Sequence, residues 1–134
     1  MKKPIDLARN LMALAYRDLE VFRLLVRADS ISDESVGFHA QQVVEKCLKA
    51  VLAYHSVEIR KTHDLGKLTD SLVKNDIPVP LDRDALESLT PYAVLLRYDI
   101  LESFPLDRAT IANHREQIIA WTEKELAEFH EDLR

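Results

Sequence analysis

Five histidines and one cysteine are the residues of this chain best suited to metal binding or nucleophilic chemistry. The histidines, at positions 39, 55, 63, 114 and 130, form no HExxH motif and no pair at metal-ligand spacing with a carboxylate in support. Cys47 has no cysteine partner and falls on an apolar stripe, so we expect a small core residue. The sequence therefore predicts no metal site and no cofactor, and it gives little support for nucleophilic catalysis.

Phosphate binding through a glycine-rich loop is excluded. The chain has only two glycines and contains neither GxGxxG nor GxxxxGK[ST]. This excludes the common nucleotide-binding loops but not nucleotide binding itself. His63 and Asp64 are adjacent, and adjacent residues of a helix do not face each other, so they form no proton relay. We interpret the segment 62–64 as the N-terminal cap of a helix.

The first element that could position functional groups is an amphipathic helix from Ile5 to about Arg27. Its apolar residues recur at three-to-four spacing, and they are Leu7, Leu11, Ala15, Leu19, Phe22 and Val26. Asp18 falls on the same side, where an unpaired carboxylate is costly, so we expect it to be paired or to line a pocket. Four arginines share an arc of about 120° on the other side, forming a solvated face or a stripe that contacts RNA or a partner: Arg9, Arg17, Arg23 and Arg27.

A second helix is predicted from about Val36 to Tyr54, after a polar segment at 29–35 that is rich in capping residues. Its buried stripe consists of Val36, Ala40, Val43, Cys47, Val51 and Tyr54. Gln42, Glu45, Lys46 and Lys49 fall on the opposite side, with His39 at the margin. The two lysines are interpreted as solvated residues whose stems cover apolar surface.

The rest of the chain also has helical periodicity. We expect a short helix at 65–75, a fourth helix at 86–96 that Pro91 kinks or restarts, a loop at 97–105, and a long helix from about 106 to 133. No strand alternation and no repeat is found. The sequence therefore predicts an all-α fold: a single domain, residues 1–134, built as an up-and-down antiparallel bundle of about five helices.

Composition limits the classes of partner. The chain is 47% hydrophobic and 31% charged, which is ordinary for a globular protein, and no apolar run approaches the length of a membrane span. The N-terminus has no apolar signal-peptide core, so we expect a cytoplasmic protein without membrane contact. A formal net charge of -5 argues against broad electrostatic binding of nucleic acid, although a local basic patch is compatible with it.

Three blocks of sequence resemble the HEPN family (higher eukaryotes and prokaryotes nucleotide-binding). They are the run 38–50, FHAQQVVEKCLKA; the run Thr62-His63-Asp64-Leu65 with Leu68; and Arg97-Tyr98-Asp99. They occur in the family's order and spacing. The resemblance implies a helical bundle that commonly forms homodimers. Prokaryotic members are often encoded beside a minimal nucleotidyltransferase as a toxin-antitoxin or related two-component system.

The resemblance also implies candidate sites. Many members cleave RNA without metal through an Arg-x4-6-His motif near the start of the last long helix, where histidine exchanges a proton with the ribose 2′-hydroxyl and arginine stabilises phosphate charge. The residues after Arg97 at that distance are Glu102, Ser103 and Phe104, and none is histidine. The only match is Arg108-x5-His114, whose side chains would point about 120° apart on a continuous helix. The candidates for binding nucleotide or RNA are His39, Gln42, Lys46, Lys49, Arg97, Tyr98 and Asp99.

Three functions remain open at this stage. The leading hypothesis is a HEPN-like binding component, a homodimer working with a minimal nucleotidyltransferase and with nucleotide or RNA as a candidate ligand, and not catalytic alone. The first alternative is a metal-independent endoribonuclease toxin that uses Arg108 and His114. The second is a pure protein-interaction module. For Arg97, Tyr98 and Asp99 the alternative to ligand binding is structural, with arginine at a helix end and tyrosine packed beneath it.

Overall fold

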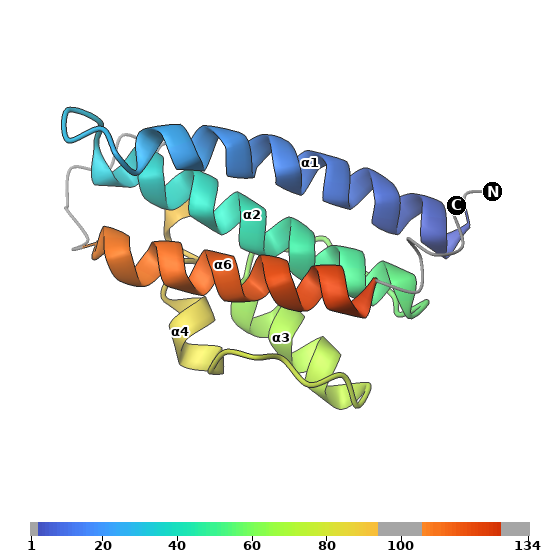
Figure 1. The fold of residues 1–134 in the computed structure, drawn as a ribbon. Coiled ribbons are helices and arrows are strands. Elements are labelled where there is room, and N and C mark those ends of the chain that lie inside the picture. Colours follow the sequence, from blue (N-terminus) through green and yellow to red (C-terminus); the bar gives the residue numbers. More distant parts are fainter. Residues whose placement is uncertain (1–2, 94–105, 127–134) are drawn as a thin grey trace.

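The computed structural model describes residues 3–93 and 106–126, and these residues form helices without any strand. The helices are α1 (Pro4–Leu25), α2 (Asp33–Tyr54), α3 (Leu65–Lys74), α4 (Arg83–Glu87) and α6 (Arg108–Glu125) (Figure 1). The predicted all-α bundle is confirmed. Within the described residues, no helix is both long and apolar enough to span a bilayer.

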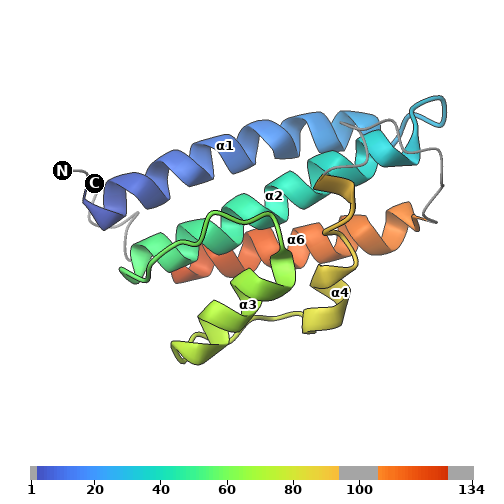
Figure 2. The same cartoon turned by 180° about the vertical axis from the view of Figure 1, so that it is seen from behind.

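Helix α2 is the central element of the bundle. It lies between α1 and α6 in both views, while α3 and α4 lie on the side of the bundle away from α1 (Figures 1 and 2). α1 is antiparallel to α2, and α6 begins beside the end of α1 and the start of α2, so α6 runs parallel to α2. Between α2 and α6 the chain forms α3 and α4, and α6 begins at the end of the bundle where α2 begins.

Helix α1 begins with Pro4 in its first turn, where a missing backbone N–H costs nothing. Its buried face consists of Ala8, Met12, Ala15, Leu19 and Phe22. Leu7, which periodicity assigned to this face, is 39% exposed, and Leu11 is only partly buried. The buried face of α1 is therefore centred nearer to Ala8 and Met12 than periodicity predicts, because the small Ala8 side chain allows α2 to approach closely.

Helix α2 is capped by Ser32, whose hydroxyl accepts a hydrogen bond from the Ser35 N–H at 3.2 Å. Neighbouring helices cover most of its circumference, so burial extends beyond the expected stripe to Gln41 and Glu45. Cys47 is fully buried as expected, and burial raises the pKa of its thiol to about 12. This thiol is therefore protonated at neutral pH and poorly suited to nucleophilic attack.

The Glu87 side chain joins the end of α4 to the start of α3. Asp64 caps α3 by accepting from the Lys67 N–H at 3.1 Å, and Glu87 at the end of α4 accepts from the Gly66 N–H at 2.7 Å. α4 ends at Glu87, and the chain turns through Ser88–Thr90 before Pro91. The expected interruption before Pro91 is therefore present, but the helix that precedes it covers Arg83–Glu87, whereas periodicity predicts a start at residue 86.

Candidate functional site

One polar strip runs along α2, and it consists of His39, Gln42, Lys46 and Lys49. All four residues are partly exposed, whereas the residues between them are buried. The strip lies between α1, which contributes Asp18, and the segment before α3, which contributes His63. The four candidate ligands that the sequence placed on this helix thus share one narrow surface.

Asp18 lies at the side of this polar strip that faces α1. Its carboxylate accepts a hydrogen bond from the Lys46 ammonium, and His39 Nδ1 lies 3.3 Å from its other oxygen. The Asp18 side chain is only 16% exposed, so a carboxylate without these partners would carry a large desolvation cost. The polar partners expected for Asp18 are therefore His39 and Lys46.

Glu45 lies at the other side of the strip, next to the segment before α3, and binds three side chains there. Its carboxylate accepts hydrogen bonds from Gln41 Nε2 at 2.9 Å and Lys49 Nζ at 3.0 Å, and His63 Nδ1 lies 2.7 Å from Oε1. Burial raises the pKa of Glu45, but the bonds from Gln41, His63 and Lys49 outweigh burial and lower it overall. Periodicity had placed Glu45 on the solvated side of α2. It is buried instead, because the segment before α3 covers it.

The arrangement leaves the polar strip electrically balanced. Lys46 is paired with Asp18 and Lys49 with Glu45, so neither ammonium is an unpaired cation. A phosphate could bind either lysine only by competing with a carboxylate already in place. The strip is better suited to directional polar contacts than to capture of an anion. Arg97, Tyr98 and Asp99 lie outside the described residues.

The Arg108 side chain binds to the end of the bundle where α1 is connected to α2. Its guanidinium donates to the carbonyl oxygens of Ala28 at 3.0 Å and Ile31 at 2.6 Å, and its Nε lies 3.0 Å from the Asp33 carboxylate. Longer contacts reach the carbonyls of Leu25 and Val26. The side chain therefore holds the end of α1, the α1–α2 connection and the start of α2 together. Every nitrogen of the guanidinium already has an acceptor.

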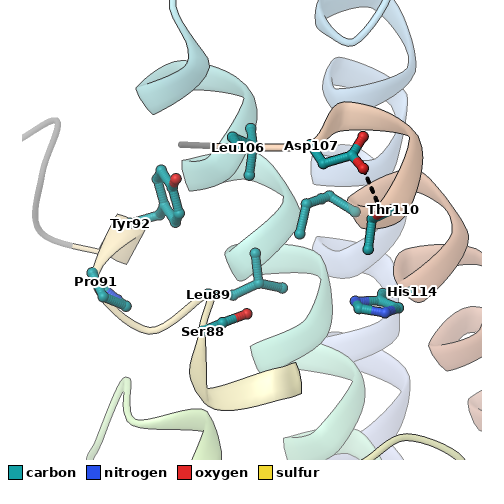
Figure 3. A pocket seen from close by; sticks show the side chains of 9 residues that line it. Ser88, Leu89, Pro91, Tyr92, Leu106, Asp107, Thr110 and His114 are labelled. Carbon is teal, nitrogen blue, oxygen red and sulfur yellow. Dashed lines mark hydrogen bonds between the residues drawn. The ribbon is translucent and has the colours of Figure 1, made fainter. Parts of the chain in front are cut away.

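The His114 side chain lies in a pocket, away from the residues that Arg108 binds. It lines a pocket of about 500 Å3 between the start of α6 and the turn after α4 (Figure 3), and Arg108 is absent from its lining. Asp107 caps α6 beside it and accepts from the Thr110 hydroxyl at 2.7 Å, as Figure 3 shows. The remaining lining is mostly apolar, and His114 Nδ1 is buried without a hydrogen-bond partner among the described residues.

Two polar features of the site were not found from the sequence. Glu45 falls on the predicted solvated face of α2 and Gln41 falls next to it, and the segment containing His63 covers both residues. Their spacing of four residues was an available signal, because residues i and i+4 are neighbours on a helix.

Comparison with known families gives one match. The family model of the HEPN domain matches residues 8–126 of the chain. The match includes the polar strip of α2, Arg108 and His114. Neither the curated proteins nor the solved structures contain a match.

Proposed function

Because this chain belongs to the HEPN domain family, we propose that it is the binding component of a two-component, toxin-antitoxin-like system whose partner is a minimal nucleotidyltransferase. The observation that carries the proposal is the set of bonds made by Arg108. Its guanidinium has backbone carbonyls and Asp33 as acceptors, so it is not free to stabilise a phosphate during RNA cleavage. This arrangement supports a binding role over RNA cleavage.

The polar strip of α2 supports the same function as a contact surface for the partner. Asp18 and Glu45 hold Lys46 and Lys49 in defined positions, so little side-chain entropy is lost when a partner binds. His39 and Gln42 lie beside them and offer further hydrogen-bonding groups. Nucleotide or RNA is a weaker candidate ligand for this strip, because both ammonium groups already have carboxylate partners.

The protein is also proposed to be a homodimer. Leu7, Leu14 and Val21 follow one another at intervals of seven residues on α1, and all three are more than a third exposed. We call this set the apolar stripe of α1. Seven-residue spacing keeps apolar side chains on one seam of a helix, as in coiled coils. A second copy could cover the stripe with its own α1.

The first test is a binding experiment. The protein should form a stoichiometric complex with the nucleotidyltransferase encoded by the neighbouring gene. Gln42→Lys should weaken that complex at least tenfold, because it adds bulk and charge to the strip, while the lysine can still donate to Gln41. Gln117→Lys, an exposed change on α6, is the matched control and should bind like the wild type. Failure of the wild type to bind contradicts the proposal.

A ribonuclease is the second candidate, and the unpartnered Nδ1 of His114 favours it. The test is incubation of the purified protein with a mixed RNA substrate in the absence of metal. We expect no cleavage. Cleavage that His114→Ala abolishes would establish the ribonuclease instead. Arg108→Ala cannot serve in this assay, because its bonds join α1 to α2 and its loss would also damage the fold.

A further inference from the structure

A groove lies between α3 and the segment that leads into it from α2 (Figure 2). It has a volume of about 530 Å3, and Arg60 of that segment contributes to one of its sides. On the other side Lys67, Ser71 and Lys74 follow one another at spacings of four and three residues, so they share one face of α3. The opposite face of α3 is buried in the bundle. The groove is therefore formed on the outer surface of the molecule, where a ligand can reach it.

The cations of this groove are free of ion pairs. Arg60, Lys67 and Lys74 are all exposed, and no ion pair within the described part of the chain includes any of them. The two lysines of the polar strip of α2, by contrast, each have a carboxylate partner. An anionic ligand could bind in the groove without displacing a carboxylate of the protein.

Two carboxylates also line the groove, but they do not neutralise it. Asp70 already accepts two hydrogen bonds from Arg83, at 2.8 Å from Nε and 3.0 Å from Nη2. Glu58 has no ion-pair partner among the residues that the structure describes, and its charge offsets one cation. Three cations are thus opposed by one unpaired carboxylate. The groove attracts anions although the formal net charge of the chain is -5.

The distribution of charge in the groove distinguishes between anionic ligands. Lys67 and Lys74 lie seven residues apart, which is about 10 Å along a helix axis, so they suit separate anionic groups. Glu58 and Asp70 lie among the cations and would repel a chain that is charged at every unit, as RNA is. No aromatic side chain lines the groove to stack bases. A chain that carries carboxylates at intervals, with neutral residues between them, fits this mixed lining better.

We propose that this groove binds an acidic peptide segment of a partner protein, in which carboxylates alternate with neutral residues. The carboxylates would pair with Arg60, Lys67 and Lys74. The Ser71 hydroxyl donates to the Lys67 carbonyl oxygen at 3.2 Å, so its own oxygen can accept a backbone N–H of the bound segment. The inference goes beyond the proposed function, because the groove uses no residue of the polar strip of α2.

The probe is a peptide of five Glu-Ser repeats with its ends acetylated and amidated. It is titrated calorimetrically into the whole chain at low ionic strength, because salt screens exposed charges. A peptide of five Gln-Ser repeats and a decamer of uridylate are separate arms. We expect the Glu-Ser peptide to bind, the Gln-Ser peptide not to bind, and the oligouridylate to bind at least fivefold more weakly than the Glu-Ser peptide.

Three variants locate the site. Lys67→Glu and Lys74→Glu should each weaken binding of the Glu-Ser peptide by about fivefold or more, because each replaces an attraction by a repulsion. Lys124→Glu makes the same change at an exposed position of α6 outside the groove and should change binding less than twofold. All three lysines are exposed, so these variants should keep the fold, which circular dichroism checks. Gln42→Lys should leave peptide binding unchanged, so loss of the nucleotidyltransferase contact and loss of this site are distinguishable.

Any of three outcomes would overturn the proposal. One is that the wild type does not bind the Glu-Ser peptide at millimolar concentration, or binds the Gln-Ser peptide equally well. Another is that Lys124→Glu weakens binding as much as the two variants of α3, which indicates a general effect of net charge. The last is that oligouridylate binds as tightly as the peptide and loses affinity in the same variants, which would make the groove a nucleic-acid surface.

Discussion

At the scale of single residues, Arg108 has the most bonds to the rest of the fold. Its guanidinium joins carbonyls at the end of α1 and in the connection to α2 with the Asp33 carboxylate. We predict that Arg108→Ala lowers the free energy of unfolding by about 2–3 kcal/mol, because several partly buried acceptors lose a charged donor. Arg17→Ala, an exposed control, should change it by less than about 0.5 kcal/mol. Urea denaturation monitored by circular dichroism measures both, and equal effects would contradict the prediction.

Glu45 provides a prediction about pH. Its pKa is lowered in the folded protein from an ordinary value of 4.5, so its ionised form stabilises the fold above that value. This stabilisation is lost as the pH falls through the lowered pKa. Glu45→Gln lacks the charge at every pH. The difference in unfolding free energy between wild type and Glu45→Gln should therefore be largest near pH 7 and should shrink on acidification below pH 4.5. A difference that stays constant or grows on acidification would show that the carboxylate charge is not responsible.

These two residues show what spacing can and cannot predict. The angle of Asp18 on its helix was enough to expect polar partners, since that angle depends on α1 alone. The burial of Glu45 depends on His63, which is 18 positions away and approaches only after the chain has turned. The role of Arg108 likewise depends on carbonyls of residues 25–31, so a motif of arginine and histidine at family spacing could not reveal it.

At the scale of elements, helical periodicity predicted the described helices well but misjudged which side of a helix is covered. α1 exposes Leu7 and buries Ala8, because periodicity does not specify where the neighbouring helix approaches. The interruption before Pro91 was easier to predict, since proline restricts the backbone locally, although α4 ends at Glu87 and not at the expected break after Thr90. Local rules therefore set the ends of helices, whereas packing selects their buried faces.

The contact between α2 and the turn after α4 depends on a glycine. Replacing a glycine inside a helix by alanine usually stabilises by about 1 kcal/mol. At Gly37, however, a Cβ would overlap the ring of Tyr92, which is buried and cannot easily move. We predict that Gly37→Ala lowers the melting temperature by several degrees, measured by thermal denaturation. Gly66→Ala is the comparison, because the atoms nearest to its Cβ belong to the ends of the Glu87 and Arg83 side chains, which can move. It should cost less, although it disturbs the bond from the Gly66 N–H to Glu87. Stabilisation by Gly37→Ala would contradict this packing.

At the scale of the whole molecule, the charges have distinct local arrangements. The polar strip of α2 pairs each lysine with a carboxylate, whereas no carboxylate of the described residues forms an ion pair with Arg115 of α6. A net charge of -5 therefore does not describe how the charges are arranged on any one surface. The amino-acid sequence identifies the family, whereas the packing of the helices determines which side chains meet at each surface.

The apolar stripe of α1 leads to a prediction about assembly. Leu7, Leu14 and Val21 are 39%, 40% and 37% exposed in the single chain, and leaving such a row in water is unfavourable. Pairing with α1 of a second copy would bury all three residues at once, with Leu14 near the centre of the contact. We therefore expect sedimentation at micromolar concentration to give about twice the chain mass of 15.4 kDa.

Leu14→Glu tests that assembly, because it would place two carboxylates at the centre of the proposed contact. We predict a shift of the sedimenting species to the monomer with little change in melting temperature, since Leu14 contributes little to the core of one chain. Val73→Glu is the matched control. Val73 is 59% exposed on α3, away from the stripe, so the same substitution there should leave the dimer intact. A dimer that persists in Leu14→Glu would show that the copies meet through another surface, and a wild-type monomer would contradict dimerisation itself.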